Sequence, residues 1–191
     1  MKKKILYFAA IVICISIITG GTLAHYTTED TARNVITSGG VSVKIVEQRL
    51  VDGELKPYPN ERIKMMPSSE VSKIVTVKNL EKDAWVRLSY TVTVYDAADN
   101  QMDITAEELK SVILIEPDDE KWTEKDGWWY YDSALESGES STPLFESVTF
   151  SGPNMGNKYQ GSTVLIDVIA EAVQKANNGD AVEEALGWSE D

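Results

Sequence analysis

The sequence predicts an all-β protein, a jelly-roll-like β-sandwich with one short inserted helix and a short C-terminal helix. From Ala84 to Tyr95, apolar residues alternate with mixed ones, as expected of a long half-buried strand. A second alternating run spans Ser162 to Val173. Six weaker segments bring the strand candidates to eight, at 41–48, 63–66, 71–79, 112–116, 127–131 and 144–150. Short strands separated by turn signals are typical of sandwiches and jelly rolls.

Two short helices are expected to interrupt the strands. Thr105-Ala106-Glu107-Glu108 has the pattern of a capping box, in which the Thr105 hydroxyl accepts from the Glu108 amide and the Glu108 side chain reaches back. This helix should end near Ser111. A second helix is predicted from Asp180, as N-cap, to Leu186, and Gly187 should stop it.

Composition excludes several classes of function. The chain has 191 residues, with 18 Lys and Arg against 31 Asp and Glu, and a formal net charge of −13. Such a charge argues against nucleic acid as a partner, because no basic field displaces counterions from phosphates. A single Cys and a single His exclude a disulfide scaffold and a zinc site with several imidazoles. We therefore expect no cofactor, no metal and no catalytic residue.

The first 24 residues have the order of a secretory signal peptide. Three lysines, Lys2 to Lys4, precede an uncharged and mostly apolar run from Ile5 to Ile18. Small residues follow, and they predict cleavage between Ala24 and His25. Removing three lysines and no acid lowers the net charge from −13 to −16, and it also removes Cys14. The alternative is a retained membrane anchor, because 20 uncharged residues can span a bilayer.

The predicted organisation is a signal peptide (1–24), an N-terminal arm (25–40) and a β domain (41–191). The arm is polar, rich in Thr, and ends in Gly39-Gly40. It is either a disordered leader or a strand that pairs outside its own chain, since an extended arm can complete the edge of a neighbour's sheet. The candidate assembly residues are His25, Tyr26, Val35, Ile36 and Val41.

Aromatic residues gather in one short segment although they make up only 8% of the chain. They are Trp122, Trp128, Trp129, Tyr130 and Tyr131. Neighbours on a strand face opposite ways, so either both faces are covered or one aromatic face is exposed. We favour a hairpin around Lys125-Asp126-Gly127 that packs on the core. The alternative is an interaction patch for a partner protein or a sugar.

Other candidates for chemistry are less specific. Asp96, Asp99, Asn100 and Asp103 cluster after the long strand, but the spacing of an EF-hand is absent, so a polar loop is favoured over a calcium site. The same holds for Asp118-Asp119-Glu120. His25 would be the first residue after cleavage, where a catalytic base is poorly preorganised.

Several segments together resemble the TasA and camelysin family of exported biofilm-matrix fibre proteins. They are Gly20-Gly21-Thr22-Leu23-Ala24, the stretch from Met66 to Lys73 before the run Val75 to Asn79, and Asn157 to Gly161 before the strand at 162–173. This chain has Pro67-Ser68 where the family usually has Pro-Gly. The resemblance implies a jelly roll, cleavage by a SipW-type signal peptidase, and fibres in which one subunit's N-terminal strand enters the next subunit.

These observations lead us to expect a secreted, non-enzymatic subunit of extracellular or biofilm-matrix fibres at the cell surface. Its main partner would be a second copy of itself, and a cell wall or an accessory matrix protein is a further candidate. Two alternatives remain open at this stage. One is a secreted camelysin-like metallopeptidase, a label that the family carries but that the residues do not support. The other is a monomeric binding domain that uses the aromatic residues.

Overall fold

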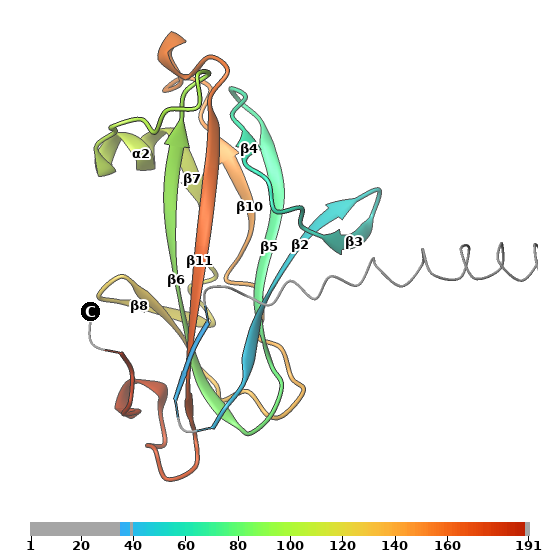
Figure 1. Cartoon of the computed structure of the whole chain (residues 1–191), viewed down its shortest axis with the longest axis vertical. Coiled ribbons are helices and arrows are strands. Elements are labelled where there is room, and N and C mark those ends of the chain that lie inside the picture. The colour runs from blue at the N-terminus through green and yellow to red at the C-terminus, as the bar shows by residue number, and fades with distance from the viewer. Residues whose placement is uncertain (1–34, 39, 190–191) are drawn as a thin grey trace, which may run out of the picture. The chain divides into compact units, whose positions relative to one another are not determined.

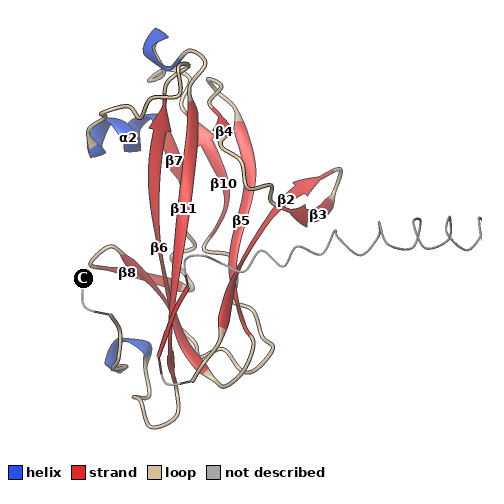
Figure 2. Ribbon diagram, in the orientation of Figure 1, coloured by secondary structure: helices blue, strands red, loops and turns tan. Residues whose placement is uncertain are grey.

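A computed structural model describes residues 35–38 and 40–189, and it shows an all-β sandwich (Figures 1 and 2). The first sheet has the strand order β1-β11-β6-β9-β8, and β4 also pairs with β11. Its strands are β1 (Val35–Ser38), β4 (Ile63–Lys64), β6 (Ala84–Tyr95), β8 (Trp122–Lys125), β9 (Trp128–Tyr131) and β11 (Thr163–Gln174). The predicted fold class, all-β with two sheets, is confirmed.

The second sheet packs against the first and has the order β3-β2-β5-β10-β7. Its strands are β2 (Val43–Val51), β3 (Glu54–Pro57), β5 (Glu70–Asn79), β7 (Ile113–Ile115) and β10 (Phe145–Phe150). Hairpin β2–β3 stands out from the body of the sandwich, as Figure 1 shows. At its tip Asp52 and Gly53 both have positive φ, 54° and 81°, which is the backbone of a tight two-residue hairpin turn.

The two long strands that the sequence predicts lie side by side at the centre of the first sheet. β6 and β11 pair antiparallel over twelve residues each, from Thr163 opposite Tyr95 to Gln174 opposite Ala84. The predicted apolar faces are the buried ones: Val86, Leu88, Val164 and Ala170 are all 0% exposed. Side chains of this face and of the second sheet form one continuous core.

Three strands, β1, β3 and β8, were not among the eight strand candidates, although the hairpin favoured around Lys125-Asp126-Gly127 implies β8. Each is only four residues long and lies at or next to the edge of a sheet. Short edge strands bury little, so they carry little of the alternation by which a strand is recognised. All four residues of β3 are exposed.

The inserted helix is confirmed as α2 (Ala106–Val112), one residue longer than expected. The Thr105 hydroxyl accepts from the Glu108 amide at 3.2 Å, as the capping pattern predicts. The other half of the predicted capping box, in which the Glu108 side chain reaches back to the start of the helix, is wrong. The Glu108 carboxylate instead accepts from the Tyr159 hydroxyl at 2.7 Å and pairs with Lys158, because the short helix η1 (Asn157–Tyr159) lies beside it.

The predicted C-terminal helix is reduced to the single turn η2 (Val182–Glu184). Seven residues are too few to form a stable helix without packing. Here packing favours another conformation, because the Asn178 side chain accepts from the Leu186 amide at 2.7 Å. Val182 and Ala185 are thereby held against Trp85 and Val173 on the outer face of the first sheet.

The turn at Pro67-Ser68 keeps the geometry that a Pro-Gly turn would have. Ser68 has φ of +58°, and the Ser69 amide donates to the Met66 carbonyl at 3.2 Å. Proline at the second position and a positive φ at the third define a type II turn. Serine is therefore accommodated in the left-handed region, where glycine is the usual residue.

Removing a side chain from the centre of the core should destabilise the protein strongly. Leu88→Ala leaves a cavity at a fully buried site, and we expect it to cost about 2–5 kcal/mol of the free energy of unfolding. Leu50→Ala is the matched control, because Leu50 is 55% exposed. This substitution should change the free energy of unfolding by less than about 0.5 kcal/mol. Urea unfolding of both variants measures the difference, and equal losses would contradict the assigned core.

Candidate functional site

Part of the predicted arm belongs to the chain's own sheet. β1 runs parallel to β11 and pairs Val35 with Ala170 and Ser38 with Val173. The first sheet therefore includes residues 35–38, which precede Val41, where the β domain was expected to start. Ile36 points away from the core and is 45% exposed, whereas Val35 packs against it. A left-handed Gly40, with φ of +70°, follows this strand.

Not all the candidate assembly residues are free to contact another chain. Val41 is 5% exposed and belongs to the core of its own chain, so its side chain has no room for an acceptor. Val35 and Ile36 pair with β11 of the same molecule. His25 and Tyr26, together with the cleavage site between Ala24 and His25, lie outside the described residues.

The five clustered aromatic residues form the β8–β9 hairpin that the sequence favoured. Trp122 pairs with Tyr131 across the hairpin, and the turn residues Asp126 and Gly127 have φ of 54° and 81°. One face covers the core, where the Trp122 and Tyr131 rings are 4.9 Å apart. Trp128, only 8% exposed, is also buried, whereas Trp129 and Tyr130 are half-buried. Both faces of the hairpin are therefore covered.

The outer face of the hairpin surrounds a buried ion pair. Arg87 on β6 donates to Glu171 on β11 at 2.5 and 2.8 Å, and both side chains are at most 6% exposed. The guanidinium also donates to the Tyr130 hydroxyl at 2.8 Å and lies 4.0 Å from the Trp128 ring centre. Stacking on an aromatic face is favourable for a planar cation.

The C-terminal segment closes this cluster from outside. The Ser189 amide donates to Glu171 at 2.5 Å, and the Ser189 carbonyl accepts from Arg87 at 3.2 Å. Trp188 covers the guanidinium at 4.9 Å and meets the Tyr130 ring edge-on at 5.7 Å. Segments far apart in the sequence are therefore joined through one pair of opposite charges.

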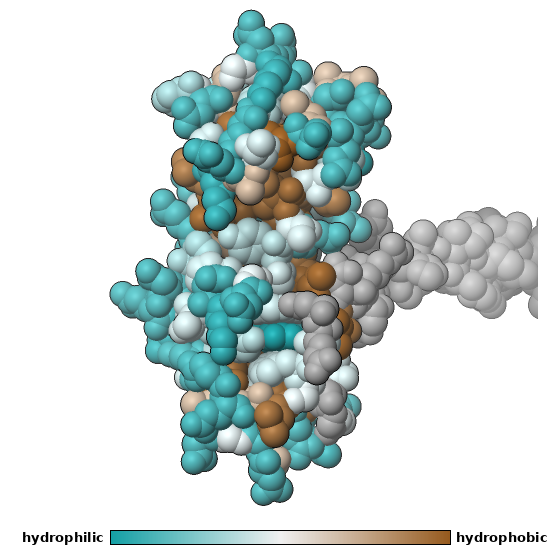
Figure 3. All heavy atoms as spheres, turned by 90° about the vertical axis from the view of Figure 1, so that its left-hand side faces the viewer, coloured by the Kyte–Doolittle hydropathy of each residue, from teal (hydrophilic) through white to brown (hydrophobic). Residues whose placement is uncertain are grey.

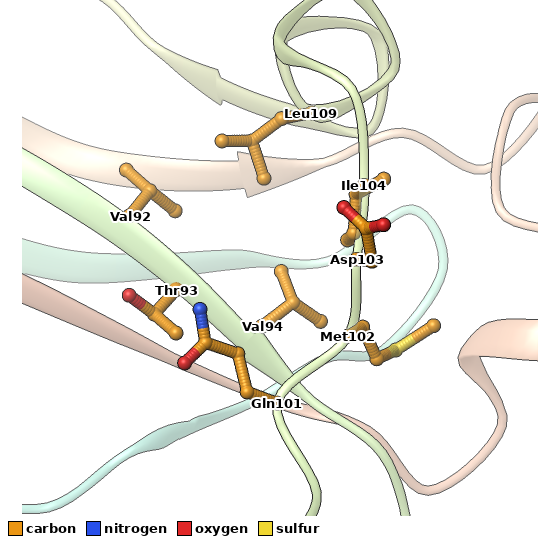
Figure 4. A pocket seen from close by; sticks show the side chains of 8 residues that line it. All are labelled: Val92, Thr93, Val94, Gln101, Met102, Asp103, Ile104 and Leu109. Atoms are coloured by element: carbon orange, nitrogen blue, oxygen red, sulfur yellow. The ribbon is translucent and has the colours of Figure 1, made fainter.

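A hollow lies beside the upper half of β6, at the open side of the sandwich (Figure 4). Its volume is about 430 Å³. Val92 and Val94 on β6 face it from one side, and Ile104 and Leu109, before and on α2, from the other, as Figure 4 shows. Met102, Gln101, Asp103 and Thr93 complete the lining. The hollow is thus apolar at its base and polar at its rim.

The acidic loop after β6 uses its carboxylates to hold its own turn. Asp96 accepts from the amides of Ala98 and Asn100 at 2.8 and 2.9 Å. The hydrogen bonds from Asn100 hold the pKa of Asp96 below its ordinary value. Asp99 pairs with Arg62, and Asp118 likewise accepts from the Glu120 amide at 3.2 Å. Among residues 35–38 and 40–189, no group of three or more potential ligands could hold a metal ion.

Two functional features were missed from the sequence. Opposite charges on the two longest strands, Arg87 and Glu171, were a usable signal, but the register that joins them was unknown. The hollow gives no local signal, because it depends on where α2 packs relative to β6.

Within the described range, no helix is long and apolar enough to cross a bilayer.

Comparisons with known proteins identify no relative. No family model matches the chain, and neither a curated protein nor a solved structure matches it.

The buried ion pair should be required for stability as a unit. Glu171→Gln leaves the Arg87 charge buried without its counter-charge, and we expect a loss of about 3–5 kcal/mol in the free energy of unfolding. The double variant Arg87→Met with Glu171→Leu removes both charges, so its free energy of unfolding should fall by less than that of Glu171→Gln. Urea unfolding measures these losses. An unchanged free energy of unfolding in Glu171→Gln would show that Arg87 is not held by charge.

The contact between α2 and η1 should depend on pH. Lys158 and Tyr159 donate to Glu108 and hold its pKa below the ordinary value of 4.5. A carboxyl whose pKa is lowered on folding stabilises the protein at pH values above its ordinary pKa. This stabilisation is lost as the pH falls through the lowered pKa of the folded state. Wild type should therefore exceed Glu108→Gln in unfolding midpoint at pH 7 and not at pH 2. An equal difference at both pH values would contradict this.

Proposed function

We propose that this protein is a secreted structural subunit that assembles into extracellular fibres of the TasA and camelysin type. In this proposal the N-terminal segment is cleaved by a SipW-type signal peptidase, and the new N-terminal residues pair with the sheet of another copy. Main-chain pairing supplies affinity in such strand addition, and side-chain pockets supply specificity. No reaction is catalysed.

The observation that carries the proposal is the position of β1. It is a strand of four residues at the edge of the first sheet, and among the described residues it pairs on one side only, with β11. The segment immediately before it is thus attached at the rim of a sheet, where strand pairing between molecules is geometrically open. β1 itself anchors that segment to the fold, so the pairing element is narrowed from 25–40 to residues 25–34.

The resemblance and the charge pattern support the same conclusion. A positive head and an apolar run precede the small residues before Ala24, as in exported proteins. Without Cys14 the exported chain has no cysteine, so its stability comes from non-covalent interactions and not from disulfides. A self-supporting core of this kind can be joined into fibres without covalent links.

Deleting residues 25–34 should abolish fibres and leave the subunit folded, because the described fold begins at Val35. We expect monomers by light scattering, an unchanged β-type circular dichroism spectrum, and no filaments by negative-stain microscopy. Mass spectrometry of the exported wild type should give His25 as the first residue.

Two controls make this test specific. Replacing residues 25–34 with a Gly-Ser segment of equal length should also abolish fibres. This control shows whether assembly needs the sequence of the segment or only its length. Leu186→Ser changes a side chain that is 78% exposed and lies outside residues 25–34, and it should leave fibres intact. Wild-type fibre growth by the deletion variant would overturn the proposal.

A further inference from the structure

The edge of β6 that faces away from β11 is only partly paired. β9 pairs with it at Arg87 and Leu88, and the returning chain contacts it again where the Met102 amide donates to the Val94 carbonyl at 2.8 Å. Between these points lies a five-residue stretch, Ser89 to Thr93. No strand pairs with its outer side in the described part of the chain.

Two residues of this stretch direct their backbone groups outward. Successive residues of a strand direct their N–H and C=O to opposite edges. Ala84 exchanges hydrogen bonds with Leu135 on the β9 side, and Val94 accepts on that side too. Residues in step with them, Tyr90 and Val92, therefore present their N–H and C=O groups to the open edge, whereas Thr91 faces β11.

The hollow described above lies along this same edge. Seen from that side, Figure 3 shows a concentrated apolar area in the upper half of the molecule, bordered by polar residues. Val92, Ile104 and Leu109 line the hollow and are half-buried, so apolar side chains of the hollow reach solvent. An open sheet edge beside an apolar hollow is the combination that strand addition uses.

We propose that the β6 edge from Ser89 to Thr93 is the acceptor for residues 25–34 of a second copy. This inference rests on the proposed function and names its binding site. The order β1-β11-β6 puts β1, to which residues 25–34 of the same chain are joined, on the other side of β11 from this edge, and this favours an occupant from another molecule.

Length and side chains of the segment fit this edge. Ten extended residues reach roughly 33 Å and the open stretch of five needs roughly 17 Å, so about half the segment remains to bridge two subunits. Thr27, Thr28 and Thr31 are good strand formers. Tyr26 offers a ring for the apolar base of the hollow and a hydroxyl for its rim, where Gln101 and Asp103 lie.

Cysteine cross-linking between two differently labelled preparations tests the inference. In the full chain with Cys14→Ser, one preparation carries Tyr26→Cys and the other Gln101→Cys, an exposed residue at the hollow. We expect the mixed disulfide at a yield at least tenfold above that with Lys56→Cys, an exposed position on β3. Thr28→Cys, two residues further along the same strand face, replaces Tyr26→Cys if the latter stops assembly.

A second measurement follows single amides. Hydrogen exchange at Tyr90 and Val92 should be fast in monomers and at least tenfold slower in fibres. Thr91 and Thr93 pair with β11 in both states and serve as internal controls. Fibres without the Gln101 cross-link and without new protection at Val92 would overturn the acceptor and leave the proposed function standing. Absence of fibres from the wild type would overturn both.

Discussion

The antiparallel pairing of β6 with β11 is the interaction on which the rest of the structure depends. Its twelve-residue register sets one continuous apolar face toward the core and brings Arg87 opposite Glu171 on the other face. Because side chains alternate with a period of two, a slip by one residue would exchange these faces. The core and the charge pair therefore fix the same register independently.

The outer face of the β6–β11 strand pair is unusual for a sandwich, because its lower half is covered and not exposed to solvent. The aromatic hairpin and the C-terminal segment enclose two charges that would be costly to bury separately. Each wall of this enclosure is itself marginal: a four-residue hairpin strand and a single helical turn. The ion pair thus adds a polar link between two elements that also pack on the sheet through apolar side chains.

Most of the fold could be predicted from the sequence, and the reasons for the exceptions are physical. β6 matched its predicted bounds and β11 differed by one residue at each end, because both strands are long and alternate over their whole length. The Thr105 cap is a local interaction and could be read from four residues. The C-terminal helix failed because Asn178, eight residues before Leu186, decides the local conformation.

The candidate site was less accessible to prediction. The arm was inferred from its composition, but the parallel pairing of its residues 35–38 with β11 depends on contacts more than 130 positions away. The hollow at β6 likewise requires the placement of α2 and of the chain around Met102. Local patterns indicate which segments form strands, and long-range register decides which edges they leave open.

The positions of β1 and of the open β6 edge on opposite sides of β11 have a consequence for symmetry. The proposed contact from one to the other joins unlike surfaces, so it does not close on itself in a two-fold pair, and its repetition gives a ring where the rotation closes and otherwise an open linear array. Such an array has a direction: an empty groove is left at one terminus and a spare arm at the other. A subunit without its arm could still occupy the last place and would stop further addition there.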